Sequence, residues 1–140
     1  MTLVLRYIAR SDRGLVRANN EDSFYAGPRL LALADGMGGH AAGEVASQLV
    51  IQALRTLDDD EPGGDLLAAL DRATHRGNAA IAEQVERSPD LDGMGTTLTA
   101  ILFAGSRIGL AHIGDSRGYL FRDGELTQIT RDDTFVQTLV

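Results

Sequence analysis

The chain has 140 residues, enough for one domain, and 44% of them are hydrophobic, which is sufficient for a buried core. Its net charge is −7, with 20 acidic residues against 13 lysines and arginines, and this balance argues against nucleic-acid binding. The absence of cysteine excludes thiol catalysis, disulfides and cysteine–zinc sites, and it is compatible with the cytoplasm. The sequence contains no apolar run of about 18 residues that would indicate a membrane-spanning helix.

The first part of the chain is predicted to form three strands. Residues 3–10 alternate between apolar and polar side chains, a pattern typical of a half-buried strand. After a polar loop over residues 11–22, the segments 23–26 and 30–34 are predicted as two strands joined by a Gly-Pro turn. Asp35 comes directly after the second of them, and a glycine follows it at once. We therefore expect a carboxylate at a strand end, where the backbone can approach an ion or a phosphate.

Two helices are predicted next. Residues 41–57 and 65–86 carry apolar residues at a period of 3.6, and Asp65 is a plausible N-cap of the second helix. Gly77 inside this helix costs on the order of 1 kcal/mol relative to alanine, so we expect a close helix or sheet contact there. The run of acids at 58–61 is interpreted as a solvated loop rather than a cation site.

The remaining sequence changes to a period of two. Residues 97–104 and 107–113 are predicted as a hairpin, and residues 117–122 and 125–129 as strands around a type I′ turn. Strands followed by helices and then by an antiparallel meander indicate an α+β fold. Residues 134–140 look like the start of a helix, and we expect the chain to be a fragment.

Four acidic residues are candidates for metal binding, because each lies in a polar or glycine-rich loop beside a strand end. They are Glu21, Asp22, Asp35 and Asp115. Mg²⁺ and Mn²⁺ prefer such oxygen ligands, and Asp35 could bridge two ions with the Gly36 carbonyl as a backbone ligand. A water held between two metal ions is acidified and can attack a phosphorus atom. Taken singly, Asp35 and Asp115 are better explained as a helix cap and a turn residue.

Other features leave alternatives open. Residues 36–41 match the dinucleotide fingerprint G-x-G-x-x-A, but the second strand that this motif requires before its acidic residue is missing from the prediction. Arg17 lies in a polar loop and could clamp a phosphate. His40 could transfer protons, whereas we expect His112 in the core and His75 on an exposed helix surface.

Four motifs occur in order along the chain. They are Arg17-x-x-Asn20-Glu21-Asp22, Ala34-Asp35-Gly36-Met37-Gly38-Gly39, Gly93-Met94-Gly95-Thr96-Thr97 and Gly114-Asp115-Ser116-Arg117. Together they resemble the metal-dependent Ser/Thr protein phosphatases of the PPM, or type-2C, family over essentially the whole chain. The resemblance implies an α+β sandwich of two antiparallel β-sheets flanked by helices (α-β-β-α), incomplete in this chain. Residues 1–140 would form the N-terminal portion of one phosphatase domain.

The resemblance also implies roles for the acidic residues. Asp35 would bridge two Mn²⁺ or Mg²⁺ ions, and Gly36 would lend its backbone carbonyl. Glu21 and Asp22 would bind metal or orient the water around it. Asp115 would help to bind a third ion.

The implied activity is hydrolysis of phosphoserine and phosphothreonine in proteins by a water that two metal ions activate, with Asp35 and Arg17 as the catalytic residues. Arg17 would hold the substrate phosphate. The expected partners are phosphorylated proteins in the cytoplasm, including Ser/Thr kinases and their substrates. Met37 stands where many members have a histidine that is proposed as general acid, so the proton would come from water at the metal or from another group such as His40.

The family's two further metal-binding aspartates belong to Ser-Asp-Gly and Asp-Asn motifs that this sequence does not contain. We therefore expect weak metal binding, little activity and poor solubility for these 140 residues. A longer form could carry a membrane anchor. The alternative reading is a catalytically silent pseudophosphatase that binds phosphoproteins, and a more distant one is a nucleotide-binding module.

Overall fold

The computed structural model describes residues 5–12, 14–15, 20–38, 42–59 and 65–139, without the side chains of residues 133–139. The long helices are α1 (Ala42–Arg55) and α2 (Leu66–Arg87), and the short 3₁₀ turns are η1 (Thr56–Asp58) and η2 (Pro89–Leu91). The strands are β1 (Asp22–Ala26), β2 (Leu30–Met37), β3 (Gly95–Thr96), β4 (Leu98–Ala104), β5 (Arg107–Gly114), β6 (Tyr119–Arg122), β7 (Glu125–Gln128) and β8 (Asp133–Leu139).

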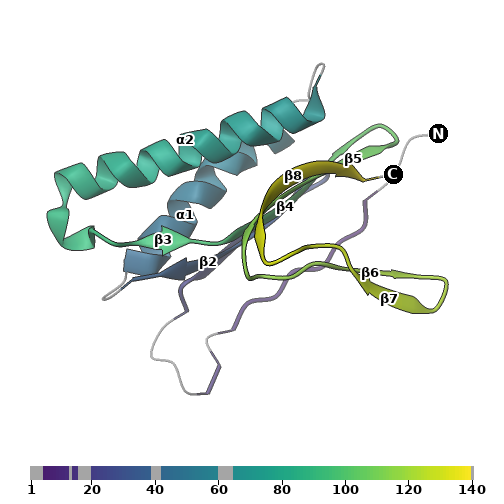
Figure 1. The fold of residues 1–140 in the computed structure, drawn as a ribbon, viewed down its shortest axis with the longest axis horizontal. Coiled ribbons are helices and arrows are strands. Elements are labelled where there is room, and N and C mark those ends of the chain that lie inside the picture. Colours follow the sequence, from purple (N-terminus) through teal and green to yellow (C-terminus); the bar gives the residue numbers. More distant parts are fainter. Residues whose placement is uncertain (1–4, 13, 16–19, 39–41, 60–64, 140) are drawn as a thin grey trace.

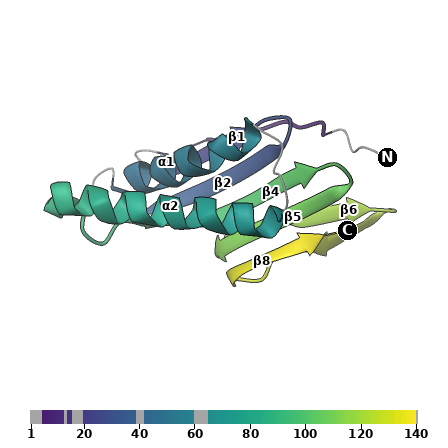
Figure 2. The ribbon, with the colours of Figure 1, turned by 90° about the horizontal axis from the view of Figure 1, so that it is seen from above.

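These strands form two antiparallel sheets. The larger sheet has the order β1-β2-β4-β5-β8, with β3 paired to the far end of β2, and β6 and β7 form a separate hairpin. Both long helices cover one face of the larger sheet, whereas residues 5–10 and the β6–β7 hairpin lie on its other side (Figure 1). Seen from above, α1 and α2 run along this sheet next to each other (Figure 2). The predicted α+β class with two antiparallel sheets is confirmed.

The core forms where the sheet meets the helices. In β2 the alternation sends Leu30, Ala32 and Ala34 toward the helices, where each is buried, and leaves Leu33 exposed on the opposite face. The same alternation buries one side of β4, and the apolar stripes of both helices pack against it. The main cluster comprises Leu30, Ala32, Ala34, Val50, Ile51, Leu54, Leu66, Leu70, Ala73, Leu98, Ala100, Leu102 and Ala111.

Two helix predictions are confirmed in detail. The Asp65 carboxylate accepts hydrogen bonds from the backbone N–H groups of Leu67 and Ala68, so Asp65 caps α2. Gly77 lies against α1, because a Cβ at this position would be only 3.3 Å from the Cα of Val50. A larger side chain at residue 77 would push the two helices apart.

Three strand predictions are corrected. Residues 5–10 form no strand, because they lie across the larger sheet without backbone pairing to it, and residues 3–4 lie outside the described part of the chain. β2 continues three residues beyond the predicted end, because β3 pairs with Gly36 and Met37. The predicted helix start at residues 134–140 is instead a strand as far as residue 139, where β8 ends, and residue 140 lies outside the described residues. In β8 the β-branched and aromatic residues 134–136 pair along the outer edge of β5.

The acidic run after α1 also differs from the prediction of a solvated loop. Asp58 is buried, and its carboxylate accepts hydrogen bonds from the Tyr25 hydroxyl and from the backbone N–H groups of Arg29 and Leu30. The hydrogen bond that the Tyr25 hydroxyl donates to Asp58 is the main reason that the pKa of Tyr25 lies above its ordinary value. Residues 60–61 of the run lie outside the described residues. Asp58 therefore joins the end of the first helix to the β1–β2 turn.

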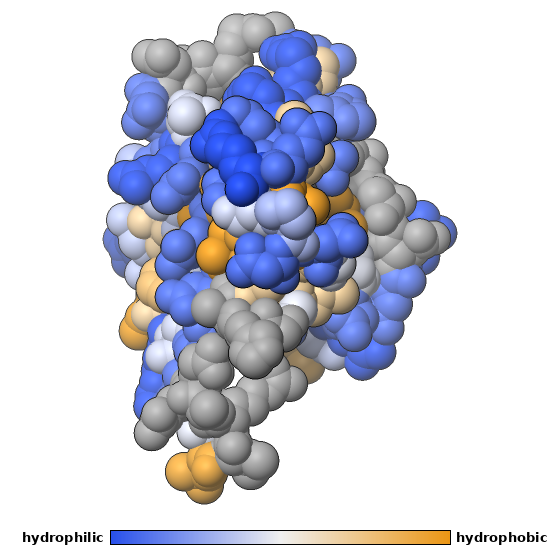
Figure 3. All heavy atoms as spheres, turned by 90° about the vertical axis from the view of Figure 1, so that its left-hand side faces the viewer, coloured by the Kyte–Doolittle hydropathy of each residue, from blue (hydrophilic) through white to orange (hydrophobic). Residues whose placement is uncertain are grey.

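The surface is mainly hydrophilic at the end of the molecule near β3, where apolar side chains show mostly within a central recess (Figure 3). Large apolar side chains are exposed on other elements. They include Phe24, Leu33 and Met37 on β1 and β2, and Tyr119, Leu120, Phe121 and Leu126 on the hairpin. Among the described residues, no helix is long and apolar enough to cross a membrane.

Candidate metal centre

The pairing of β1 with β2 places two of the predicted acids together. Asp22 and Asp35 are direct partners in this antiparallel pair, so their side chains project from the same face of the sheet, away from the helices. Asp22 is exposed and Asp35 is partly buried. The register therefore brings two carboxylates from different strands to one face.

Glu21, the residue before β1, is held by backbone and side-chain contacts. Its carbonyl oxygen accepts hydrogen bonds from the Gly36 N–H at 3.2 Å and from the Ser47 hydroxyl at 2.7 Å. Its carboxyl carbon lies close to Gly43, since it would be 2.9 Å from a Cβ built there. Glu21 is thus fixed between β2 and the first turn of α1.

Gly36 allows α1 to pack directly on β2. A Cβ at this position would lie 1.8 Å from the carbonyl oxygen of Gly43, so no other residue fits without moving the helix. Gly43 has the same constraint from the other side, because its Cβ would be 2.8 Å from the Gly36 carbonyl carbon. This contact sets the position of the Gly36 backbone that the motif predicts as a metal ligand.

Thr97 connects Asp35 to the loop that carries Asp115. The Asp35 N–H donates to the Thr97 hydroxyl oxygen, and the Thr97 N–H donates to the Asp35 carbonyl oxygen, each at 2.9 Å. The same hydroxyl lies 2.9 Å from the hydroxyl of Ser116. Gly114 turns the chain with a φ of +101°, a conformation that favours glycine. The loop after β5 is thereby directed back toward β2.

These elements converge on a pocket of about 320 Å³. Its lining residues are Glu21, Asp35, Gly36, Met37, Gly38, Thr97 and Asp115. Four of the five predicted metal ligands therefore lie around one hollow, although they come from three distant parts of the sequence. Asp22, the fifth, lines a neighbouring hollow with Ser11 and Gln48.

A model of the protein phosphatase 2C family matches residues 16–137. The chain belongs to the protein phosphatase 2C family. It is 84% identical over 140 residues to the serine/threonine protein phosphatase PstP of Mycobacterium tuberculosis, covering 100% of this chain and 27% of that protein. It is 38% identical over 142 residues to the serine/threonine phosphatase stp of Listeria welshimeri, covering 94% of this chain and 56% of the relative.

Solved structures of the 2C family agree with the fold. The crystal structure of M. tuberculosis PstP matches with a TM-score of 0.92 and 84% identity, and the match covers 95% of this chain and 57% of that one. A structure of the PstP catalytic domain in complex with two manganese ions matches with a TM-score of 0.91 over 94% of this chain and 57% of that one. The chain thus spans about a quarter of the curated M. tuberculosis relatives and just over half of the crystallised chains.

The donor set of the pocket fits a hard cation of the kind found in the 2C family. Carboxylates of Glu21, Asp35 and Asp115 and the backbone at Gly36 supply only oxygen donors, which suit Mg²⁺ and Mn²⁺. Within the described part of the chain, however, no three Asp, Glu or His side chains are grouped closely enough to hold an ion by themselves. If the pocket binds an ion, its described residues would supply only part of the coordination shell.

Four further residues, in or beside the 2C motifs, have different outcomes. Met37 lines the pocket and is exposed, but its thioether cannot donate a proton. Arg17 and His40, predicted to hold phosphate and to transfer protons, both lie outside the described residues. Arg117 follows Asp115 and forms a two-pronged ion pair with Asp132, whose carboxylate pKa it lowers by hydrogen bonding.

The nucleotide-binding reading receives no support from the topology. The fingerprint belongs to a parallel β-α-β unit, whereas every strand pair in the described residues is antiparallel.

His112 is fully buried, as expected, and its ring nitrogens contact the Thr99 hydroxyl and the Gly114 carbonyl. Because a carbonyl only accepts, Nε2 donates the hydrogen bond to Gly114.

The sequence analysis did not identify the roles of Ser47 and Thr97. Ser47 is fully buried in α1, where its hydroxyl bonds the Glu21 carbonyl and contacts the hydroxyl of Ser23. Thr97 is also buried. For Ser47, a polar residue within the apolar stripe of a helix was the available signal, whereas the residues next to Thr97 give no such signal.

Proposed function

We propose that the chain carries part of the active site of a metal-dependent protein-serine/threonine phosphatase. The observation that carries this proposal is the convergence of Glu21, Asp35, Gly36 and Asp115 on one pocket in a 2C-family chain. The 84% identity to PstP, a serine/threonine protein phosphatase, supports the reaction class. The substrates would be phosphoserine and phosphothreonine in proteins.

The proposed role of each residue follows from its position around the pocket. Asp35, on the face of β2 that lines the pocket, would bridge two Mn²⁺ or Mg²⁺ ions, and the Gly36 carbonyl would add a ligand. Glu21 and Asp22 would bind metal or orient water at the rim, and Asp115 would help to hold a third ion. The chemistry that bound ions supply in such sites is an acidified water and polarised phosphoryl oxygens. The carboxylates need this positive charge, because they would otherwise repel a phosphate.

The proposal for substrate binding rests on the sequence motif that contains Arg17. We propose that Arg17 holds the phosphate, because its guanidinium can donate two parallel hydrogen bonds to phosphate oxygens. Ser/Thr kinases and their substrates would be the partners. We also place the activity in the cytoplasm, where ATP-dependent kinases generate phosphoproteins. Residues 1–140 would supply the N-terminal portion of one phosphatase domain.

A second candidate function is a phosphoprotein-binding pseudophosphatase. It is favoured by the incomplete ligand set, since no three acidic or histidine side chains of the described residues form a metal cluster. A chain of this kind would bind a phosphothreonine peptide without hydrolysing it. The two candidates therefore differ in turnover and agree in phosphopeptide binding.

The test uses a chimaera. It joins these 140 residues to the remaining part of the M. tuberculosis PstP catalytic domain, which they do not match. Phosphate release from a phosphothreonine peptide is measured with Mn²⁺, for the parent chimaera, for Asp35→Asn and for the control Asp90→Asn. We expect turnover that Asp35→Asn abolishes and Asp90→Asn leaves unchanged, because Asp90 is exposed in η2. Undiminished turnover in Asp35→Asn would contradict the bridging role.

The unjoined chain separates the two candidates. We expect it to bind Mn²⁺ weakly, by calorimetry, and to release little phosphate. Phosphopeptide binding by an inactive chimaera would favour the pseudophosphatase.

An Arg17→Ala chimaera is expected to show a raised KM with a nearly unchanged kcat, because a ground-state contact to the phosphate is removed. A large loss of kcat alone would contradict that assignment.

A further inference from the structure

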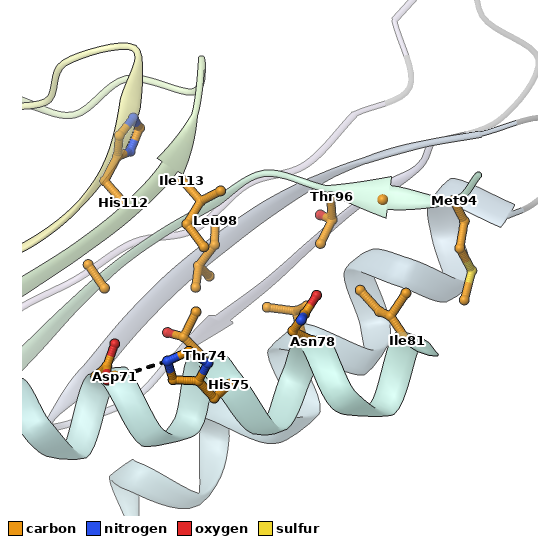
Figure 4. Close-up of a pocket in the computed structure, with 13 residues that line it drawn as sticks. Asp71, Thr74, His75, Asn78, Ile81, Met94, Thr96, Leu98, His112 and Ile113 are labelled. Carbon is orange, nitrogen blue, oxygen red and sulfur yellow. Dashed lines mark ion pairs between the residues drawn. The ribbon is translucent and has the colours of Figure 1, made fainter. Parts of the chain in front are cut away.

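A second cavity lies between α2 and the larger sheet, apart from the acidic pocket (Figure 4). Its volume is about 370 Å³, and the apolar part of its wall comes from α1, α2, the strands β4 and β5, and Met94 just before β3. The apolar lining residues are Val50, Ile81, Met94, Leu98, Ala111 and Ile113. A hollow of this size falls within the range of small-molecule sites, about 300–1,000 Å³.

The helix presents a polar stripe to this cavity. Asp71, Thr74 and Asn78 follow one another at intervals of three and four residues, the spacing of one helix face, and His75 lies beside them. The same row is apolar at its two ends, with Leu67 before the stripe and Ile81 after it. In Figure 4 the four polar residues all lie on the α2 side of the cavity, opposite Leu98 and Ile113. The α2 wall of the cavity is therefore mainly polar, and the sheet wall is mainly apolar apart from Thr96 and His112.

Three polar side chains that line the cavity, Asp71 and Thr74 on α2 and Thr96 on β3, can accept hydrogen bonds. The Thr74 hydroxyl already donates to the Leu70 carbonyl, and the Thr96 hydroxyl donates to the Thr97 carbonyl, so both oxygens retain free lone pairs. The Asp71 carboxylate can only accept. Its contact with His75, at 3.5 Å, is between side chains that are 59% and 76% exposed, so another cation can replace the imidazole. Neither Lys nor Arg is among the described lining residues.

We propose that this cavity binds a small molecule with an apolar aryl or alkyl body and a protonated amine. The body would occupy the space beside Leu98, Ala111 and Ile113, where it is removed from water. The ammonium group would donate hydrogen bonds to Asp71 and to the hydroxyl oxygen of Thr74. A carboxylate in the same place would face Asp71 without compensation.

The cavity shares a wall with the acidic pocket. β3 lines the cavity through Gly95 and Thr96, and the same two residues pair with Met37 and Gly36 of β2, which line the acidic pocket. A ligand that shifts β3 would therefore shift the backbone at Gly36. We expect amine binding and Mn²⁺ binding to change each other's affinity by the same factor. This coupling rests on the proposed function, whereas amine binding does not.

The first experiment is a titration of the metal-free chain with 4-phenylbutylamine, followed by ¹⁵N amide chemical shifts. We expect saturable shifts centred on Thr74, Thr96 and Ile113. The neutral 4-phenylbutan-1-ol should bind less tightly, and 4-phenylbutyrate should not bind. Equal binding of the amine and the carboxylate, or the absence of saturable shifts at these amides, would overturn the proposal.

Variants locate the site. Asp71→Asn should weaken amine binding about tenfold and leave alcohol binding unchanged, because only the charge is lost. Ala111→Leu should fill the apolar side of the cavity and also weaken binding at least about tenfold. Asn78→Leu, at an exposed position of the polar wall, should do the same if Ala111→Leu fails to fold. Ala82→Leu, on the exposed surface of the same helix, is the control.

The amine affinities of these variants decide whether the cavity is the binding site. Amine affinity that is unchanged in both Asp71→Asn and Asn78→Leu would overturn the proposed site. Mn²⁺ affinity is then measured by calorimetry with and without saturating amine. A Mn²⁺ affinity that changes with amine supports the coupling, and an unchanged Mn²⁺ affinity contradicts it. In either case the amine titration decides whether the amine site exists.

Discussion

Asp35 and Thr97 exchange two hydrogen bonds, each 2.9 Å long, although 61 residues separate them in the sequence. The backbone N–H of Asp35 donates to the Thr97 side chain, and the Thr97 N–H donates to the Asp35 carbonyl. The hydroxyl of Thr97 also contacts Ser116, the neighbour of Asp115. One buried threonine thus fixes the position of two candidate metal ligands relative to each other.

Removal of the Thr97 hydroxyl should affect both stability and metal binding. Thr97→Val keeps the shape but leaves the Asp35 N–H without an acceptor, which we expect to cost about 1–3 kcal/mol of unfolding free energy. Thr97→Ser retains the hydroxyl and should preserve Mn²⁺ affinity. Urea unfolding and calorimetry with Mn²⁺ measure the two effects. Equal Mn²⁺ affinities for the valine and serine variants would refute the positioning role.

The contact between β2 and α1 should not tolerate a methyl group. Gly36→Ala places a Cβ 1.8 Å from the Gly43 carbonyl oxygen, and we expect a loss of about 2–3 kcal/mol in unfolding free energy as the helix is displaced. Gly95→Ala is the matched control on the paired strand, since its Cβ would make only an ordinary 3.6 Å contact with Met37. Thermal unfolding of both variants tests this, and equal midpoints would contradict the packing argument.

The buried Asp58 should be a major contributor to stability. Asp58→Ala leaves the Tyr25 hydroxyl and the N–H groups of Arg29 and Leu30 without their acceptor, at a cost of about 3 kcal/mol. Asp59→Ala, at the adjacent exposed position, should change stability little. Denaturant unfolding of the pair makes the comparison. Similar losses in both variants would show that the loss is not due to the buried hydrogen bonds.

The Tyr25–Asp58 hydrogen bond also predicts a pH dependence. The pKa of Tyr25 is raised above 10.0, chiefly because its hydroxyl donates to Asp58. The folded state therefore holds this proton more tightly than the unfolded state. The resulting stabilisation is fully present below pH 10 and is lost as the pH rises through the folded-state pKa. Tyrosinate absorbance should show one late-titrating tyrosine that is absent from Tyr25→Phe, and an unchanged titration curve would disprove this assignment.

Much of the fold could be predicted because local patterns coincided with tertiary contacts. The Asp65 cap and the apolar period of α2 both depend on residues within two helical turns. The hairpin turn at Asp123 and Gly124 also follows from local preferences, and both residues have positive φ. The candidate site was predicted from four motifs, and the pocket brings together Glu21, Asp35, Gly36 and Asp115.

Features that depend on distant partners were not predictable. β2 extends past Asp35 because it pairs with β3, whose residues lie 58 to 60 positions later in the chain, and no pattern within residues 30–37 indicates this partner. Asp58 looked solvated because its three hydrogen-bond donors lie 28 to 33 residues earlier in the chain. Residues 134–139 form a strand because the outer edge of β5 offers unpaired backbone groups, a tertiary effect that outweighs local preference.

The inner position of β2 has a thermodynamic consequence for the acidic pocket. β2 is paired on both sides, by β1 on one edge and by β3 and β4 on the other, so the backbone around Asp35 is ordered when the sheet forms. Ordering a residue costs about 1–2 kcal/mol of conformational entropy. At Asp35 this entropy is lost when the chain folds and not when a cation binds. Mn²⁺ binding should therefore be driven mainly by the release of water from the ion and the carboxylates, with a favourable entropy that a flexible acidic loop could not provide.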